Sequence, residues 1–113
     1  MAKKTQTRQQ KRAQTAYECI SSRKKGDKDY SQLAKRFPAL VQSCGLAQSL
    51  AFVAAKEGST GEDYMVHLAQ VMNEEGDLGA LSRNSELMEY QRLTYEAIES
   101  ATWLKRYSEA LLE

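Results

Sequence analysis

The chain has 113 residues, 42% of them hydrophobic and 27% charged, and its formal net charge is +1. This composition excludes a largely disordered chain, and the length allows one domain over residues 1–113, with order before about Thr7 left open. No apolar run approaches the roughly 20 residues of a membrane span, and the opening MAKKTQTRQQKR lacks the apolar stretch of a signal peptide, so we expect a cytoplasmic protein without membrane contact.

The spacing predicts a first helix over about residues 4–23. Its apolar stripe recurs at steps of three and four residues: Ala13, Ala16, Tyr17 and Ile20. At about 100° per residue, a basic set falls on the opposite, solvent side: Lys4, Arg8, Lys11, Arg12 and Arg23. Cations at 23–25 and Gly26 are then expected to end the helix.

A second helix is predicted from about Asp29 to Arg36. Pro38 is expected to break or kink it, because proline supplies no amide hydrogen and restricts the preceding residue. After one more turn and an interruption at Gly45, a third helix is expected to reach about Glu57. Its apolar stripe comprises Leu46, Leu50, Val53 and Ala54.

A loop is predicted over residues 58–61, in which Thr60 can cap a fourth helix. The buried side of that helix comprises Tyr64, Leu68, Val71 and Met72. A second break at 76–79 precedes a long helix that begins near 82–85 and ends at about Leu112. We therefore expect an all-α fold, a compact bundle of about five to six helices with a long C-terminal helix.

The last helix is apolar on two sides. One side is expected to face inward: Leu87, Tyr90, Leu93, Thr94, Ala97, Ile98, Ala101, Leu104, Leu111 and Leu112. The other side carries Met88, Tyr95, Trp103 and Tyr107. Such a helix is either central to its domain or presents one face to a partner, and both interpretations stay open. Large aromatics are typical interface anchors, so the candidate partner interface is Tyr95, Trp103 and Tyr107.

Catalytic and metal chemistry have little support. His67 is the only histidine, and Cys44 with His67 is the single conceivable pair of nucleophile and base. Both are better interpreted as a packed thiol and an interfacial histidine. Cys19 and Cys44 are expected to be reduced and packed. No zinc spacing and no phosphate-binding glycine loop occurs, so we expect no catalytic residue, no metal, no cofactor and no enzyme.

The charge is sorted along the chain. Residues 1–56 hold 12 Lys/Arg against 3 Asp/Glu, and residues 57–113 hold 4 against 12, so +9 nearly cancels −8. This pattern favours a polyanionic partner for the first half, because cations gain affinity by releasing counterions from a phosphate backbone. It also allows the acidic half of one copy to attract the basic half of another. The alternative is a merely solvated surface.

The candidate nucleic-acid-binding residues of the first half are Arg23, Lys24, Lys25, Lys28, Lys35 and Arg36, together with cations of the first helix that include Lys3 and Lys4. Only Tyr30 is placed among these cations to stack on a base, which argues against a sequence-specific reader of single strands. We expect recognition by charge.

Three blocks of sequence carry a resemblance. They are FPALVQSCGLAQSLAF at 37–52, YQRLTYEA at 90–97 and WLKRYSEA at 103–110. In this combination and order, the chain resembles the small helical subunit of the Cmr complex, the type III-B CRISPR effector, which is an RNA-guided machine that destroys foreign RNA. The resemblance extends from about Tyr30 to Glu113.

The resemblance implies a non-catalytic subunit of an antiviral defence complex. Several copies would stack into a minor filament and help to hold the target RNA and guide duplex by backbone contacts. Its partners would be other Cmr subunits, further copies of itself, target RNA and guide RNA. Lys105 and Arg106 match one family block and are expected to contact phosphate or a neighbouring subunit, whereas Gly45 with Leu46 allows close helix packing. A helical scaffold that touches only proteins, and an unrelated helical DNA-binding regulator, remain as alternatives.

Overall fold

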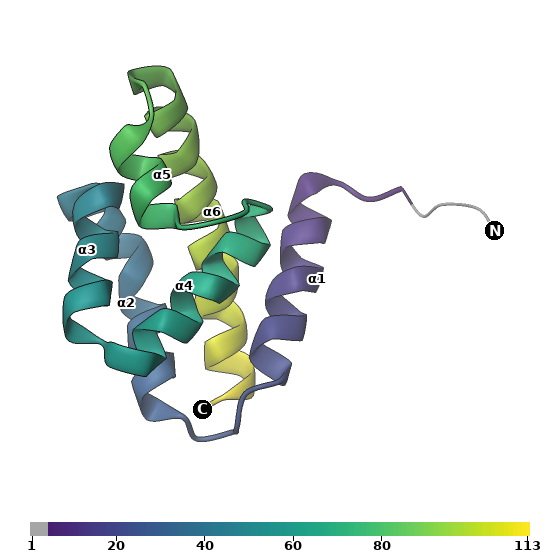
Figure 1. The fold of residues 1–113 in the computed structure, drawn as a ribbon. Coiled ribbons are helices and arrows are strands. Elements are labelled where there is room, and N and C mark those ends of the chain that lie inside the picture. The colour runs from purple at the N-terminus through teal and green to yellow at the C-terminus, as the bar shows by residue number, and fades with distance from the viewer. Residues whose placement is uncertain (1–4) are drawn as a thin grey trace.

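The computed structural model describes residues 5–113, and over that range it consists of six helices and no strand (Figure 1). They are α1 (Arg8–Ser21), α2 (Lys28–Cys44), α3 (Leu46–Lys56), α4 (Gly58–Met72), α5 (Leu78–Asn84) and α6 (Leu87–Leu111). The prediction of an all-helical bundle with a long last helix is confirmed. Lys3 and Lys4 lie outside the described residues.

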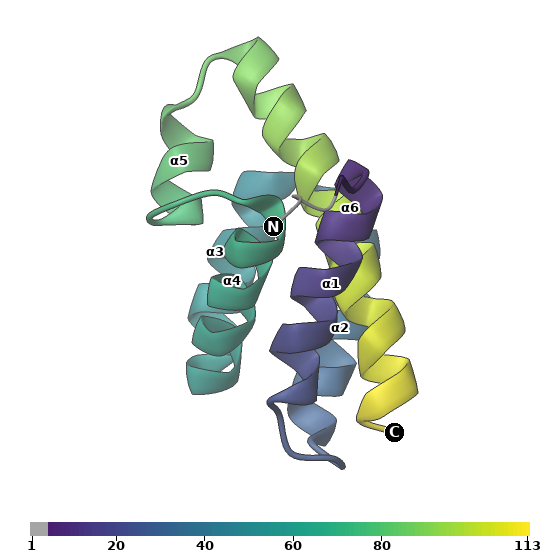
Figure 2. The same cartoon turned by 90° about the vertical axis from the view of Figure 1, so that its right-hand side faces the viewer.

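Helix α6 lies at the centre of the arrangement and makes its most extensive contacts with α2 and α1. Helices α3 and α4 pack on each other and complete the bundle, and α5 packs on α3. In both views, α5 and the start of α6 lie at one end of the molecule, whereas the α1–α2 connection and the C-terminus lie at the other (Figures 1 and 2). The fold therefore has two distinct ends.

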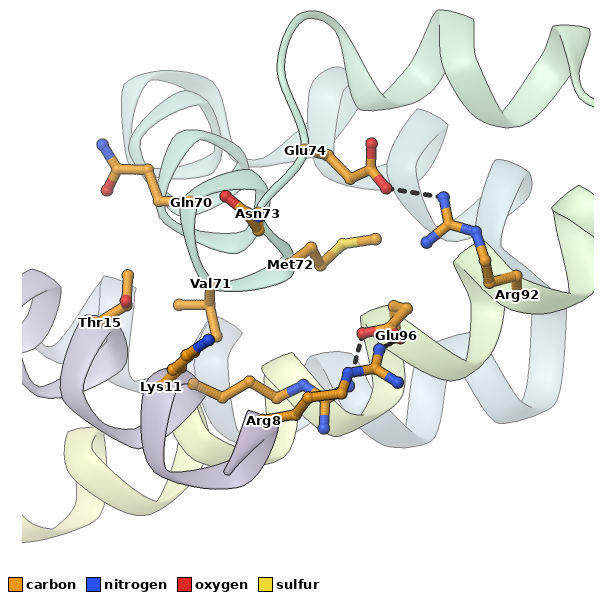
Figure 3. A pocket seen from close by; sticks show the side chains of 11 residues that line it. Arg8, Lys11, Thr15, Gln70, Val71, Met72, Asn73, Glu74, Arg92 and Glu96 are labelled. Carbon is orange, nitrogen blue, oxygen red and sulfur yellow. Dashed lines mark hydrogen bonds and ion pairs between the residues drawn. The ribbon is translucent and has the colours of Figure 1, made fainter. Parts of the chain in front are cut away.

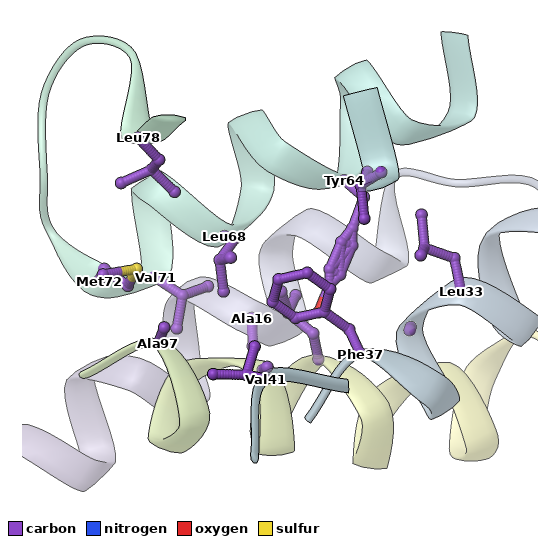
Figure 4. Close-up of a cluster of buried hydrophobic side chains, with 14 of the residues drawn as sticks. Ala16, Leu33, Phe37, Val41, Tyr64, Leu68, Val71, Met72, Leu78 and Ala97 are labelled. Carbon is purple, nitrogen blue, oxygen red and sulfur yellow. The ribbon is translucent and has the colours of Figure 1, made fainter. Parts of the chain in front are cut away.

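The core joins buried side chains from all six helices and the C-terminal Leu112 (Figure 4). Aromatic rings dominate its α2–α4 side: Phe37 lies 5.2 Å and Tyr30 lies 5.7 Å from the ring of Tyr64. Burying one such side chain stabilises the fold by about 1.5–3 kcal/mol. Because Tyr30 is fully buried, the one aromatic that the sequence places among the cations is not available to stack on a base.

Helix α1 begins later than predicted, because Thr7 caps it. The Thr7 side chain accepts from the Gln10 amide and the Gln10 side chain accepts from the Thr7 amide, which forms a capping box. Ala16 and Ile20 are buried as predicted, whereas Tyr17 is 47% exposed. The placement of Arg12 on the solvent side is wrong: Arg12 is buried because Glu96 of α6 faces it.

Helix α2 continues through Pro38, so of the predicted break or kink the break is wrong. Proline removes one hydrogen bond of the helix, but Phe37 and Val41 on either side are buried, and their packing outweighs that loss. The chain turns instead at Gly45, whose φ of 85° favours glycine. There the Ala47 amide donates to the Tyr90 hydroxyl at 3.0 Å, which joins the start of α3 to α6.

The predicted loop at 58–61 and the cap by Thr60 are wrong. Glu57 alone separates α3 from α4, and Gly58 already begins α4, which has no side-chain cap. The junction is this short because Gly61 is buried against α3: an added Cβ would lie 2.8 Å from Glu57 Cβ and 2.9 Å from the Val53 carbonyl oxygen. The buried stripes of both helices otherwise match the prediction, except that Ala54 is exposed.

The segment before α6 contains the short helix α5, which the sequence did not indicate. Asp77 caps it by accepting from the amides of Gly79 and Ala80. Helix α6 then starts at Leu87, which is 71% exposed rather than inward as predicted. The prediction of two packed thiols is half wrong: Cys19 is buried, but Cys44 is exposed at the end of α2, and both are free.

Candidate nucleic-acid and partner interfaces

Three lysines gather at the α1–α2 connection. Lys24 and Lys25 lie in the connection and Lys28 begins α2; all three are exposed and none forms an ion pair with residues 5–113. The Gly26 amide donates to the Leu112 carbonyl oxygen at 2.9 Å, which fixes the connection to the end of α6. We call Lys24, Lys25 and Lys28 the basic end.

Arg23 lies beside the basic end but has a different environment. Its guanidinium contacts Asp27 at 2.6 Å and Asp63 at 3.0 Å, and it lies 4.2 Å over the Tyr30 ring. Burial acts to lower the pKa of Arg23, but the hydrogen bonds to Asp27 and Asp63 outweigh burial and raise it. Since two carboxylates neutralise it, Arg23 mainly joins α1, α2 and α4.

Lys35 and Arg36 are also paired. Lys35 contacts the Glu113 carboxylate, and Arg36 contacts that of Glu57. Both cations are partly exposed, so these pairs each contribute at most about 1 kcal/mol and can exchange with a ligand. Of the six candidates in the first half, the basic end is therefore the part with uncompensated charge.

Arg106 of α6 lines a cavity of about 430 Å³. Trp103 and Tyr107 also line this cavity, and their ring centroids lie 6.0 Å apart in a stacked arrangement. The Trp103 indole donates to Gln9 Oε1 at 2.7 Å, and Tyr107 meets Tyr17 edge-on at 5.6 Å. These aromatics are thus partly packed against α1 of the same chain.

The other members of the α6 set lie apart. Lys105 is half-buried, whereas Tyr95 is 56% exposed and its hydroxyl lies 3.4 Å from Glu99 Oε1. The structure thus divides the predicted residues between the end of the molecule near the α1–α2 connection and helix α6, where only Trp103 and Tyr107 are shown to pack against α1. Tyr17 is an exposed aromatic beside Tyr107 that the sequence interpretation assigned to the core.

The conceivable nucleophile and base do not meet. The Tyr30 hydroxyl lies 2.6 Å from His67 Nδ1, and Cys44 is 14 residues further along α2, about 21 Å along a helix. Burial, followed by the charge of Arg23, lowers the pKa of His67, and burial raises the pKa of the Cys19 thiol to about 11. Among residues 5–113, no three His, Cys, Asp or Glu side chains gather to hold a metal ion.

The family described as CRISPR-associated protein (Cas_Cmr5) matches residues 8–111. The chain belongs to the Cmr5 family. It is 38% identical over 111 residues to a protein of Thermus thermophilus named CRISPR system Cmr subunit Cmr5, and the match covers 95% of this chain and 97% of that protein. The family match spans α1 to α6 and so includes the first helix, which lies before the predicted region of resemblance.

The fold is that of a solved Cmr5 family protein. The X-ray crystal structure of a CRISPR-associated Cmr5 family protein from Thermus thermophilus superimposes with a TM-score of 0.87 at 36% identity, and the match covers 96% of this chain and 100% of that chain. In the described part of this Cmr5 family chain, no helix is both long and apolar enough to cross a bilayer.

Sequence reasoning missed one charged cluster of this Cmr5 fold. Arg8, Lys11 and Arg12 of α1 meet Glu96 and Arg92 of α6 around a further cavity (Figure 3). A signal was present: Arg12 precedes the buried Ala16 by one helical turn, and Glu96 adjoins the buried Ala97. A basic residue in the apolar stripe of α1 and an acidic residue in that of α6 indicate a buried ion pair between the two helices.

Proposed function

We propose that the chain is a non-catalytic small subunit of a Cmr effector complex, an RNA-guided antiviral assembly. In this proposal it binds other Cmr subunits, stacks with further copies of itself, and holds the target RNA and guide duplex through backbone phosphates. Family membership and the name of the Thermus thermophilus relative support the complex. The observation that carries the RNA role is the basic end, three exposed lysines without an ion pair among residues 5–113.

The basic end suits a phosphate backbone better than base edges. Lysine ammonium groups on a short connection act as point charges, and the nearest aromatic ring, Tyr30, is buried and unavailable for stacking. In RNA-guided systems, base pairing reads the sequence and the protein holds the backbone. We therefore expect RNA retention that is blind to sequence and falls with salt.

The opposite end supports head-to-tail stacking. Residues 74–89 carry five carboxylates and one cation, a net charge of −4, and the start of α6 exposes Leu87 at 71% and Met88 at 83%. We call residues 74–89 the acidic end. Because it lies opposite the α1–α2 connection (Figures 1 and 2), a contact between the two ends of neighbouring copies repeats without closing, which generates a filament.

The RNA role is tested by reversing one cation of the basic end in the full chain, Lys24→Glu. The matched control, Lys56→Glu, changes the charge equally at an exposed cation on α3 that belongs to neither end. Assembly of the reconstituted complex and retention of target RNA are measured separately. We expect Lys24→Glu to lower RNA retention at least tenfold, about 1.4 kcal/mol, and the control to leave it unchanged.

Two outcomes would contradict the RNA role. Unchanged retention in an intact complex carrying Lys24→Glu would favour a scaffold that contacts only proteins. An equal loss in the control would show that total charge, rather than the basic end, governs retention. Lys35 and Arg36 are left intact because their ion pairs with Glu113 and Glu57 also contribute to the fold.

A further inference from the structure

A cavity of about 520 Å³ lies between α1, the end of α4 and the first half of α6 (Figure 3). Four cations line it, namely Arg8, Lys11, Arg12 and Arg92, and two carboxylates, namely Glu74 and Glu96. Four positive charges against two negative charges leave an excess of +2. We call this hollow the arginine cavity.

Arg12 is the fixed cation of the arginine cavity. Its side chain is 6% exposed, and one nitrogen donates to Glu96 Oε2 at 2.5 Å. A guanidinium has five N–H donors, and Arg12 makes no other hydrogen bond with the described residues. A second nitrogen lies 4.0 Å from Glu99 Oε1, beyond hydrogen-bond distance, so the guanidinium retains donors for a ligand in the cavity that it lines.

The other cations can reach a ligand. Arg8 pairs with Glu96, and Arg92 pairs with Glu74 and with Glu89 of its own helix. The two arginine side chains are 71% and 46% exposed, so both can turn from their carboxylates. Lys11 is exposed and forms no ion pair with residues 5–113. One buried guanidinium with three adjustable cations resembles the arrangement that arginine and lysine make around phosphate oxygens.

The uncharged lining limits the ligand. Val71 and Met72 form an apolar patch, and Thr15, Gln70 and Asn73 add polar groups. Ligand sites in proteins have volumes of about 300–1,000 Å³ and combine apolar walls with a few placed polar groups. The hollow therefore has room for one nucleotide-sized molecule, and the charge of its lining residues is opposite in sign to that of a phosphomonoester, which carries about −1.5 to −2 at pH 7.

We propose that the arginine cavity binds a phosphomonoester group, carried by a nucleotide, by the 5′ end of an RNA, or as free phosphate. Arg12 and Lys11 contact the phosphate oxygens, and Arg8 and Arg92 close over it. This site is distinct from the basic end, which is proposed to contact the singly charged diesters of an RNA backbone. It does not depend on the RNA role proposed above.

The test is a titration of the isotope-labelled full chain, followed by amide chemical shifts at constant ionic strength. The probes are inorganic phosphate, uridine 5′-monophosphate, and a short RNA with a 5′-phosphate or a 5′-hydroxyl; dimethyl phosphate is the diester control. We expect saturable shifts at residues 8–15, 70–74 and 92–96 with at least one monoester probe, and none there with dimethyl phosphate or the 5′-hydroxyl RNA. The probe that binds identifies the source of the phosphate.

The matched variants are Lys11→Gln and Lys56→Gln, each the loss of one exposed lysine without an ion pair among residues 5–113. Loss of one charge-assisted hydrogen bond should weaken binding of the effective monoester about tenfold in Lys11→Gln. Lys56→Gln, on α3 and outside both the arginine cavity and the basic end, should bind it as the unchanged chain does. The proposal is overturned if no monoester gives saturable shifts at the arginine cavity, or if the two variants weaken binding equally. Loss of RNA retention at the basic end would leave these shifts unaffected, so the two proposals fail separately.

Discussion

Glu96 is a buried carboxylate that faces two guanidinium groups. Its side chain is 6% exposed, and it contacts Arg8 and Arg12 across the α1–α6 interface. Burying charges costs solvation free energy, which their mutual attraction offsets only when the geometry is close. Because Arg12 is as buried as Glu96, neither can lose its partner cheaply, and the pair sets how α1 lies on α6.

We predict that Glu96→Gln lowers the free energy of unfolding by about 3 kcal/mol, since it leaves the buried Arg12 guanidinium uncompensated. Glu99→Gln is the matched control: Glu99 is 29% exposed and lies 4.0 Å from Arg12, so its loss should cost less than about 1 kcal/mol. Urea unfolding monitored by circular dichroism measures both. Similar costs for the two variants would contradict a central role of Glu96.

His67 makes the stability of the fold depend on pH. Burial and the charge of Arg23 lower its pKa below the usual 6.5, while Asp63 opposes them. The unfolded chain therefore binds a proton at a higher pH than the folded chain. Since stability falls with falling pH wherever the unfolded state binds more protons, it should fall as the pH drops from about 7 to about 5.

We predict that His67→Gln removes this part of the pH dependence. The pKa of Asp27 is also lowered, because burial, which would raise it, is outweighed by the hydrogen bonds that Asp27 accepts from Arg23 and from the Tyr30 amide. Since a free aspartate already titrates at about pH 4, Asp27 does not contribute to the change in stability between about pH 7 and about pH 5. Urea unfolding at about pH 7, 6 and 5 should show a loss of stability that is smaller in the variant. Parallel losses in both chains would show that His67 is not the responsible group.

At the level of elements, the sequence predicted the helices that periodicity describes well. Ala16 and Ile20, and the stripe that begins at Leu46, are buried largely as expected, because these positions follow from the 3.6-residue period alone. The helix boundaries were less predictable. Pro38 stays inside α2 and Gly58 begins α4, since packing between helices outweighs the local preferences of single residues.

The candidate site was predictable in composition but not in arrangement. The sequence shows which residues are cations, but not that Arg23 lies between two carboxylates whereas Lys24 and Lys28 have no ion pair within residues 5–113. These partners come from other helices or from the chain beyond a turn, and local spacing does not indicate them. Trp103 likewise meets Gln9, which is 94 residues away.

The α3–α4 junction gives a prediction at this scale. At an exposed position inside a helix, replacing glycine by alanine stabilises the helix by about 1 kcal/mol. At Gly61, however, an added Cβ would lie 2.8 Å from Glu57 Cβ and 2.9 Å from both a side-chain carbon and the backbone oxygen of Val53. We predict that Gly61→Ala lowers the free energy of unfolding by about 2 kcal/mol. The control is Gly79→Ala in α5, where the nearest neighbour is the flexible Arg83 side chain at 3.1 Å.

Gly79→Ala should be neutral or slightly stabilising, because Arg83 can move and alanine keeps the amide that donates to Asp77. Thermal unfolding of the two variants decides the matter. If Gly61→Ala is the more stable of the two, the tight junction between α3 and α4 is not present in solution.

At the level of the whole molecule, the two ends are opposite in charge although the total is only +1. The basic end and the acidic end are separated by the length of the bundle (Figures 1 and 2). Attraction between exposed charges acts mainly within a Debye length of about 8–10 Å. The two ends of one chain are therefore too far apart to attract each other appreciably, and each is free to attract a neighbouring copy, as the proposed stacking requires.

Reversing the ends separately and together tests this arrangement. We predict that the chain self-associates at low salt, and that Lys25→Glu with Lys28→Glu, or Glu75→Lys with Glu86→Lys, abolishes this association, because like charges then meet at the proposed stacking contact. All four residues are exposed and form no ion pair with residues 5–113. The chain that carries all four substitutions should associate again, since its ends are once more opposite in charge. Sedimentation velocity at low and high salt measures the association of each variant. If the fourfold variant associates no better than the two partial ones, the ends do not meet one another and stacking uses another surface.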